Sequence, residues 1–147
     1  MTSLRLASVI VAVSLLAAPL VQAHDEKDPR HKAMTSLADN MKALAKMAKA
    51  GDMHHDQAVT HADEIAETAR RMLALFPEGS AGHGSRAKPE IWTDWSGFEK
   101  EADDFERAVD SLRAAAQSGE HARLDAALAD VGKTCSSCHK RFRLPKT

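Results

Sequence analysis

The residues best suited to chemistry lie near the C-terminal end of the sequence, in the string Cys135-Ser136-Ser137-Cys138-His139. Its two cysteines are the only ones in the chain, and the histidine directly follows the second. Residues spaced three and four apart share one face of an α-helix. If the string is helical, two thiols and one imidazole therefore point to the same side.

A C-x-x-C-H string is the attachment signature of c-type haem. The two thiols can reach neighbouring vinyl groups on one porphyrin edge, and the adjacent imidazole can reach the iron. Thioether bonds then hold the prosthetic group permanently on an exported protein. The spacing predicts one covalently bound haem c per chain, attached through Cys135 and Cys138 with His139 near the iron.

Three other uses of two nearby cysteines fit less well. A thioredoxin-like redox pair would follow a strand and begin a helix, whereas this pair lies late in a predicted helix. A zinc site needs more ligands of this kind, and the chain has no second cysteine pair. A disulfide closing so short a loop would stabilise little, because its entropic contribution grows with loop length.

Four segments with apolar residues at spacings of three and four predict the helices that position this string. They cover about residues 28–50, 56–76, 92 or 96–118, and 120–142. Pro29 suits the first turn of the first helix, and Gly51 and Gly119 suit helix ends. Ser96-Gly97-Phe98-Glu99 matches a capping box, which leaves the start of the third helix open by a turn.

The narrow apolar stripes of these helices predict an all-α, antiparallel four-helix bundle. Residues 77–89 contain three glycines and should form a loop. The stripe of the last helix passes through both cysteines, so both should face the core near the C-terminal helix. It consists of Leu124, Leu128, Val131, Cys135, Cys138 and Phe142.

Residues 1–23 have the three-part layout of a cleaved signal peptide. Arg5 precedes an apolar run at 7–16, and Val21-Gln22-Ala23 offers small residues to a signal peptidase. The apolar run is short for the roughly 30 Å of a bilayer core. We therefore expect residues 24–147 to form one domain in the bacterial periplasm.

The charge of the expected mature chain excludes one class of partner. Arg5 is the only charged residue in 1–23, so 19 Lys and Arg remain against 21 Asp and Glu. A nucleic-acid binder would show a basic excess, so none is expected. With no second long apolar run, stable membrane insertion after cleavage is not expected either.

With this motif on the last of four helices, residues 24–147 resemble the class II cytochromes c, the cytochrome c-prime family and its low-spin relatives. Weaker matches occur at Arg30-His31-Lys32-Ala33-Met34, at Lys88-Pro89-Glu90-Ile91-Trp92, at Val131-Gly132 and at Phe142-Arg143. The resemblance implies His139 as proximal iron ligand, with Arg143 near the proximal haem face. It also implies Arg30 near the propionates and Met34 at the distal iron position. Because the family often forms homodimers, monomer and homodimer both stay open.

Two functions follow from two interpretations of Met34. If its sulfur is the sixth iron ligand, the protein is a periplasmic one-electron carrier. If Met34 only packs in the core, the iron is five-coordinate and binds nitric oxide or carbon monoxide. An enzyme such as a peroxidase would need a distal acid–base group, and the first apolar stripe offers Met and Leu. We therefore expect no enzyme.

Basic residues without any acid mark the stretch from 131 to 147. They are Lys133, Lys140, Arg141, Arg143 and Lys146. Cations are favourable near a helix C-terminus, and they would also steer an acidic redox partner protein to the haem edge. Elsewhere, His54, His55, Asp56 and His61 could bind a metal, but a solvated loop explains them better.

Overall fold

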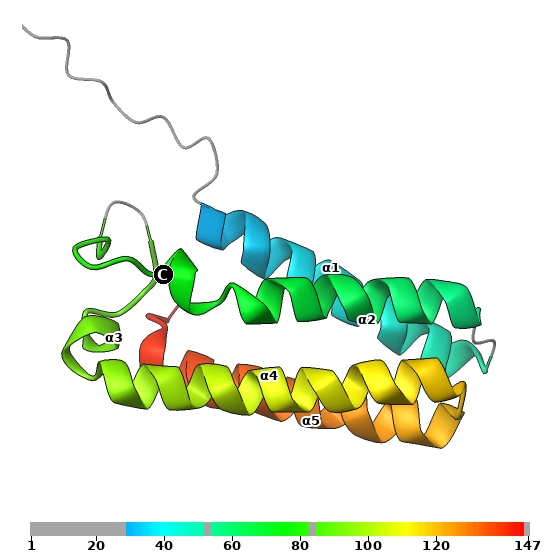
Figure 1. Ribbon diagram of the computed structural model, residues 1–147. Coiled ribbons are helices and arrows are strands. Elements are labelled where there is room, and N and C mark those ends of the chain that lie inside the picture. The colour runs from blue at the N-terminus through cyan, green and yellow to red at the C-terminus, as the bar shows by residue number, and fades with distance from the viewer. Residues whose placement is uncertain (1–28, 52–53, 83–84, 146–147) are drawn as a thin grey trace, which may run out of the picture.

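The computed structural model describes residues 29–51, 54–82 and 85–145, so the expected signal peptide and Lys146 lie outside it. The helices are α1 (Pro29–Ala50), α2 (His55–Arg70), the 3-10 helix η1 (Leu73–Leu75), α3 (Glu90–Thr93), α4 (Trp95–Ser118) and α5 (His121–Phe142). α1, α2, α4 and α5 form the predicted antiparallel four-helix bundle (Figure 1). None of the described helices has the length and apolar character needed to cross a bilayer.

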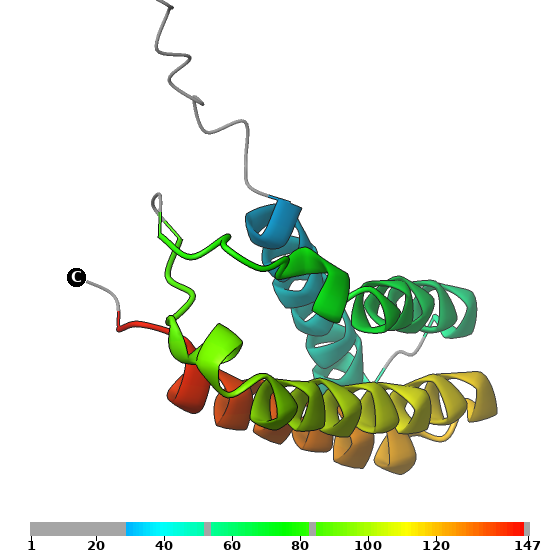
Figure 2. The same cartoon turned by 60° about the vertical axis from the view of Figure 1, so that its left-hand side comes forward.

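The four long helices contact one another in a closed ring. α1 packs on α2, α2 on α4, α4 on α5, and α5 on α1. α4 and α5 lie side by side along their length, whereas the start of α1 lies well away from the end of α5 (Figures 1 and 2). We call this end of the bundle the cysteine end. It contains the first two turns of α1, α5 from Cys135 onward, and residues 76–82 and 85–89.

The predicted apolar stripes form the core. The most deeply buried large side chains come from all four long helices and from α3. They are Leu44, Ile65, Ile91, Phe98, Val109, Leu112, Leu124 and Val131. Periodicity therefore identified the inward faces correctly, because burying one apolar face is what stabilises such helices.

Two predicted helix ends are confirmed by backbone conformation. Gly51 and Gly119 follow α1 and α4 with φ of +66° and +69°. This left-handed region is strained for residues with a Cβ, so glycine stops a helix there at low cost.

The second helix is shorter than predicted. α2 ends at Arg70, and the chain tightens into η1 before Phe76, where the sequence placed the helix end. Proline disfavours the α conformation of the residue before it, so Pro77 excludes helix at Phe76. The chain responds with a 3-10 turn, which is common at helix C-termini. Met72 and Phe76 nonetheless remain buried as the stripe predicted.

The third predicted helix is split, and its predicted capping box is wrong. α3 ends at Thr93 and α4 begins at Trp95. Asp94 caps α4 by accepting a hydrogen bond from the Gly97 backbone nitrogen at 3.3 Å. Asp94 takes this role in place of Ser96, and its carboxylate also forms an ion pair with Arg141 of α5.

Candidate haem site

α5 carries both cysteines on its inward row. Cys135 and Cys138 are free thiols, each partly buried and packed against the hydrophobic core. They follow the fully buried Val131 by four and seven residues. The predicted orientation toward the core is confirmed, and the two sulfurs share one helix face.

The thiols lie in a setting that keeps them protonated. Burial raises the pKa of Cys135. Burial also raises the pKa of Cys138 to about 11, and the nearby Glu101 carboxylate adds to this effect. Reactive redox cysteines have a lowered pKa, so the environment does not fit a thioredoxin-like pair.

His139 lies beside Cys138 and is half-buried. Burial lowers the pKa of its imidazole, and the positive charges of Arg143 and Arg86 lower it further. All three effects favour the neutral ring, which is the form that binds a metal ion. The environment of His139 therefore suits an iron ligand.

Aromatic side chains hold the end of α5 against the bundle. Phe98 of α4 contacts Phe76 and Phe142 edge-on, with ring centroids 4.8 and 5.4 Å apart. Trp95 lies 5.5 Å from the same Phe98 ring. Phe142 is three residues after His139, so this cluster fixes the helix face that presents the imidazole.

Hydrogen bonds from the long loop hold the last turn of α5 in place. The backbone nitrogen of Lys88 donates to the Phe142 carbonyl at 2.9 Å. The Lys88 ammonium donates to the carbonyls of Lys140 and Arg141 at 3.4 and 3.0 Å. These are carbonyls that the helix end leaves unpaired, so Lys88 caps the helix that carries the C-x-x-C-H string.

Arg30 and Met34 belong to the first two turns of α1, and α1 starts at the cysteine end (Figure 1). Met34 is partly buried and packs against the core that both cysteines also contact. Arg30 donates to the Ser80 carbonyl at 2.9 Å and lies over the Phe76 ring. His31 is exposed, so it faces away from the core.

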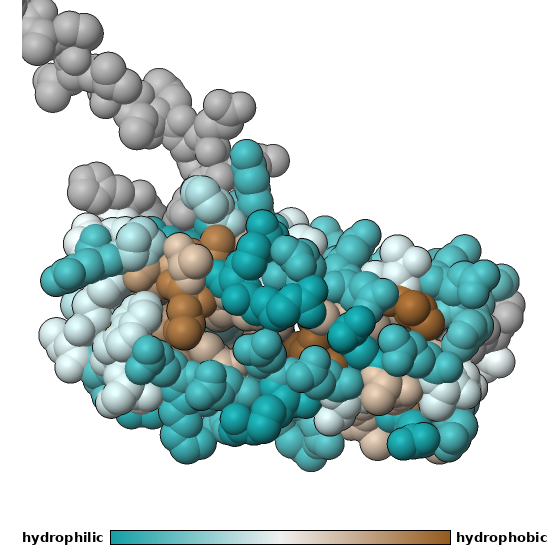
Figure 3. Space-filling model, viewed as in Figure 1, coloured by the Kyte–Doolittle hydropathy of each residue, from teal (hydrophilic) through white to brown (hydrophobic). Residues whose placement is uncertain are grey.

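The cysteine end fits a haem in its chemistry. Apolar side chains there are only partly covered, and Figure 3 shows hydrophobic surface at the end where η1 lies. The partly buried set includes Met34, Leu73, Leu75, Trp92, Trp95, Cys135 and Cys138. A porphyrin would bury such apolar surface, and two thiols with a neutral imidazole are the donors that c-type attachment requires.

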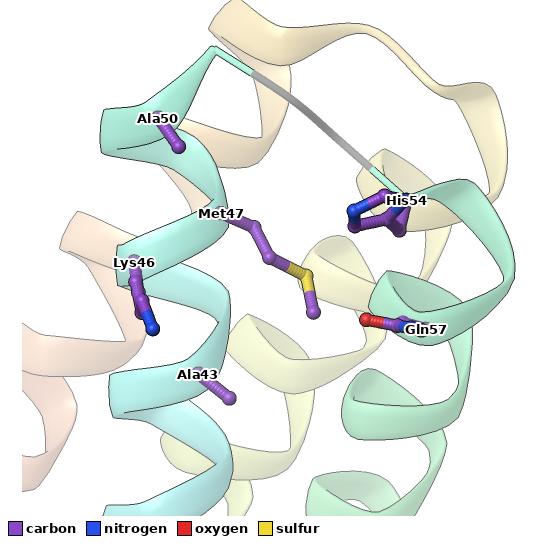
Figure 4. A pocket seen from close by; sticks show the side chains of 6 residues that line it. All are labelled: Ala43, Lys46, Met47, Ala50, His54 and Gln57. Atoms are coloured by element: carbon purple, nitrogen blue, oxygen red, sulfur yellow. The ribbon is translucent and has the colours of Figure 1, made fainter.

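A shallow hollow of about 360 Å³ lies at the opposite end, between α1 and α2 (Figure 4). Its lining contains Met47 and His54 but neither cysteine, so it is not the haem site. Among the described residues, no group of three or more His, Cys, Asp or Glu side chains is arranged to hold a metal ion. His61 instead bonds to the buried Asn40 amide oxygen at 2.7 Å.

Sequence reasoning missed three charged residues near this site. Lys88 reaches the end of α5 from the loop, and Arg86 donates to the Leu144 carbonyl just beyond it. Glu101 reaches α5 from α4, 3.8 Å from the Arg141 guanidinium. An isolated antiparallel β-bridge pairs Ala87 with Arg143, and it brings the two loop cations beside the last turn of α5. Residue type alone could not predict these contacts, because each of the three residues lies 40 or more positions along the chain from its partner near the end of α5.

Comparison with known proteins places this chain among haem proteins. The family model described as "Cytochrome C'" matches residues 25–143. Cytochrome c′ from Rubrivivax gelatinosus is 36% identical over 123 residues, covering 81% of this chain and 94% of that protein. Cytochrome c-556 from Rhodopseudomonas palustris is 32% identical over 147 residues, covering 95% and 97%.

Solved structures agree with the fold. A nitric oxide complex of a point mutant of cytochrome c prime from Alcaligenes xylosoxidans matches with a TM-score of 0.73 at 29% identity. The match covers 80% of this chain and 91% of that one. The family model, the similar sequences and the similar structures therefore all agree with the four-helix bundle and the C-x-x-C-H string.

Proposed function

Because the chain belongs to the cytochrome c′ family, we propose that it is a periplasmic one-electron carrier. Haem c, covalently attached, is the cofactor of this family, and the two cysteines match one haem per chain. When bound, haem c supplies an iron that passes between the ferric and ferrous states. The side chains of this protein would bind the haem and orient it.

Cys135 and Cys138 would bind the porphyrin edge, and His139 would be the proximal ligand. Burial of His139 keeps its ring neutral, and the aromatic cluster around Phe98 and Phe142 orients its helix. Arg143 would lie near the proximal face, since its charge acts on both His139 and Cys138. Arg30, held by the Ser80 carbonyl, would lie near the propionates.

The position of Met34 is the observation that carries the proposal. Its side chain is partly buried at the cysteine end, on the inward row of α1 with Leu37 and Met41. A thioether sulfur there would supply the sixth iron ligand and leave no vacant site. His31 faces solvent instead, so it does not compete for the iron.

The side chains on the inward row of α1 also favour an electron carrier over an enzyme. A peroxidase would need an acid–base side chain beside the distal iron position. The inward row of α1 near Met34 continues with Leu37, and the buried Asn40 already donates to the Ser36 carbonyl at 3.0 Å.

A gas-binding module is the second candidate. A related cytochrome c prime mutant from Alcaligenes xylosoxidans has a solved nitric oxide complex. If Met34 packs without bonding to iron, this chain would take nitric oxide or carbon monoxide on the α1 side.

Docking would use the basic surface at the end of α5. Arg86, Lys140 and Arg143 are exposed there, and the partly buried Lys88 adds a fourth cation. Such a surface steers an acidic redox protein by complementary charge. The signal-peptide pattern at 1–23 supports a periplasmic location.

Carbon monoxide distinguishes the two candidates. We expect the purified, reduced holoprotein to react slowly and incompletely with carbon monoxide, and to titrate reversibly as a one-electron couple. Fast, stoichiometric formation of a carbon monoxide complex by the wild-type protein would favour the gas-binding module.

A further inference from the structure

Glu101 is an unusually buried acid. Its side chain is 14% exposed, whereas the other acids in the described ion pairs are 33% to 65% exposed. It lies in α4, two turns from the helix start, and contacts Arg141 near the end of α5. A carboxylate removed from water in this way acts strongly on nearby charges, because the local dielectric is low.

The charge of Glu101 is only partly neutralised. Its nearest described cation is the Arg141 guanidinium, whose Nη1 lies 3.8 Å from Glu101 Oε1. The Nη2 of the same guanidinium lies 2.5 Å from Asp94 Oδ2. One cation is therefore shared by two carboxylates and lies closer to Asp94, so these three side chains together carry one net negative charge.

The geometry of α5 brings this charge to the haem attachment point. Cys138 and Arg141 are three residues apart, so they are neighbours on the same helix face. The contact with Arg141 places the Glu101 carboxylate at the same end of α5 as Cys138. The electrostatic effect of Glu101 on the Cys138 thiol agrees with this placement.

We propose that Glu101 lowers the reduction potential of the haem, as a buried carboxylate beside the Cys138 attachment point. The proposal rests on the proposed function only for the location of the haem at Cys138. One electron passes from a donor protein to the ferric iron and leaves to an acceptor, while Glu101 gains and loses neither proton nor electron. A nearby negative charge stabilises the ferric form, which carries one more positive charge.

The test is the midpoint potential of the holoprotein, measured by spectroelectrochemical titration. Glu101→Gln removes the charge with little change in shape. We expect it to raise the ferrous-to-ferric ratio at fixed potential at least tenfold, which is about 59 mV for a one-electron couple. Glu101→Asp keeps the charge and should stay within twofold of the wild type.

Glu106→Gln is the matched control. It makes the same charge change in the same helix, but Glu106 lies about 140° around the helix axis from Glu101. We expect less than a twofold change in the ratio. A Glu101→Gln shift no larger than that of Glu106→Gln, in proteins with full haem content, would overturn the proposal.

Arg141→Gln is a second, independent variant. Removing the shared cation should shift the ratio the other way, toward the ferric form, and a shift toward the ferrous form would also overturn the proposal. The test of Glu101 does not depend on whether the protein is an electron carrier. A protein that binds carbon monoxide fast would contradict the carrier, yet its variants would still report the effect of Glu101 on the potential.

Discussion

At the scale of single residues, the two cysteines and the histidine combine an exact spacing with a specific environment. All three lie on or beside the inward row of α5, and burial favours their neutral forms. Neutral thiols and a neutral imidazole are suited to permanent attachment and ligation rather than to thiol redox chemistry.

Haem attachment should depend on both thiols. We expect Cys135→Ala or Cys138→Ala to lower covalently bound haem greatly, and the double substitution to abolish it, because each thiol supplies one thioether bond. Haem staining after denaturing electrophoresis measures this directly, with Ser136→Ala as the control between them. Full staining of the double variant would contradict the assignment of the site.

The C-x-x-C-H string could be identified from sequence because its signal is contained in five adjacent residues. Arg86, Lys88 and Glu101 could not, because their places depend on two features without a local pattern. The path of the loop brings Arg86 and Lys88 to α5. The rotation of α4 against α5 decides that Glu101 meets Arg141.

At the scale of helices, periodicity predicted which faces are buried better than it predicted where helices end. The stripe through Met72 and Phe76 is buried as expected, although α2 ends at Arg70. Burial depends on an averaged pattern over many residues. A helix end depends on single interactions, as at α4, where the Asp94 carboxylate accepts from the Gly97 backbone nitrogen.

The observed cap of α4 leads to opposite expectations for two neighbouring residues. Asp94→Ala should lower the free energy of unfolding by about 1 kcal/mol, the usual contribution of an N-cap. Ser96→Ala should change it by less than about 0.5 kcal/mol, as exposed surface substitutions do.

Urea unfolding of the holoprotein, followed by helical circular dichroism, compares these variants. Asp103→Ala, an exposed acid of the same helix, controls for the loss of a charge. Equal destabilisation by Asp94→Ala and Ser96→Ala would restore the capping box that the sequence suggested.

At the scale of the whole molecule, the candidate haem site and a group of basic side chains lie at the same end of the bundle. Of the cations predicted to form a docking surface, Lys133 pairs with Asp130 and Arg141 pairs with Asp94. Lys140 and Arg143 remain exposed at the end of α5. Arg86 and Lys88 extend the same surface onto the loop.

Electron transfer to an acidic partner protein should therefore depend on salt. Exposed charges are largely screened beyond about 8 Å at 0.15 M ionic strength, so the rate should fall as salt rises. Lys140→Glu should slow it further at low salt, whereas Lys49→Glu, at the opposite end of the bundle, should have little effect. Stopped-flow kinetics measures these rates. A Lys140→Glu rate equal to that of the wild type at every salt concentration would contradict the docking role and leave only the favourable placement of a cation near a helix C-terminus.

We propose that one haem c lies between α5 and α1, with Met34 as the sixth iron ligand. The most direct test is the spin state of the ferric holoprotein, read from its absorption and electron paramagnetic resonance spectra. We expect low-spin wild-type protein, high-spin Met34→Ala, and low-spin Met41→Ala as the control on the same helix face. A wild-type protein that is already high-spin, and that Met34→Ala leaves unchanged, would contradict it.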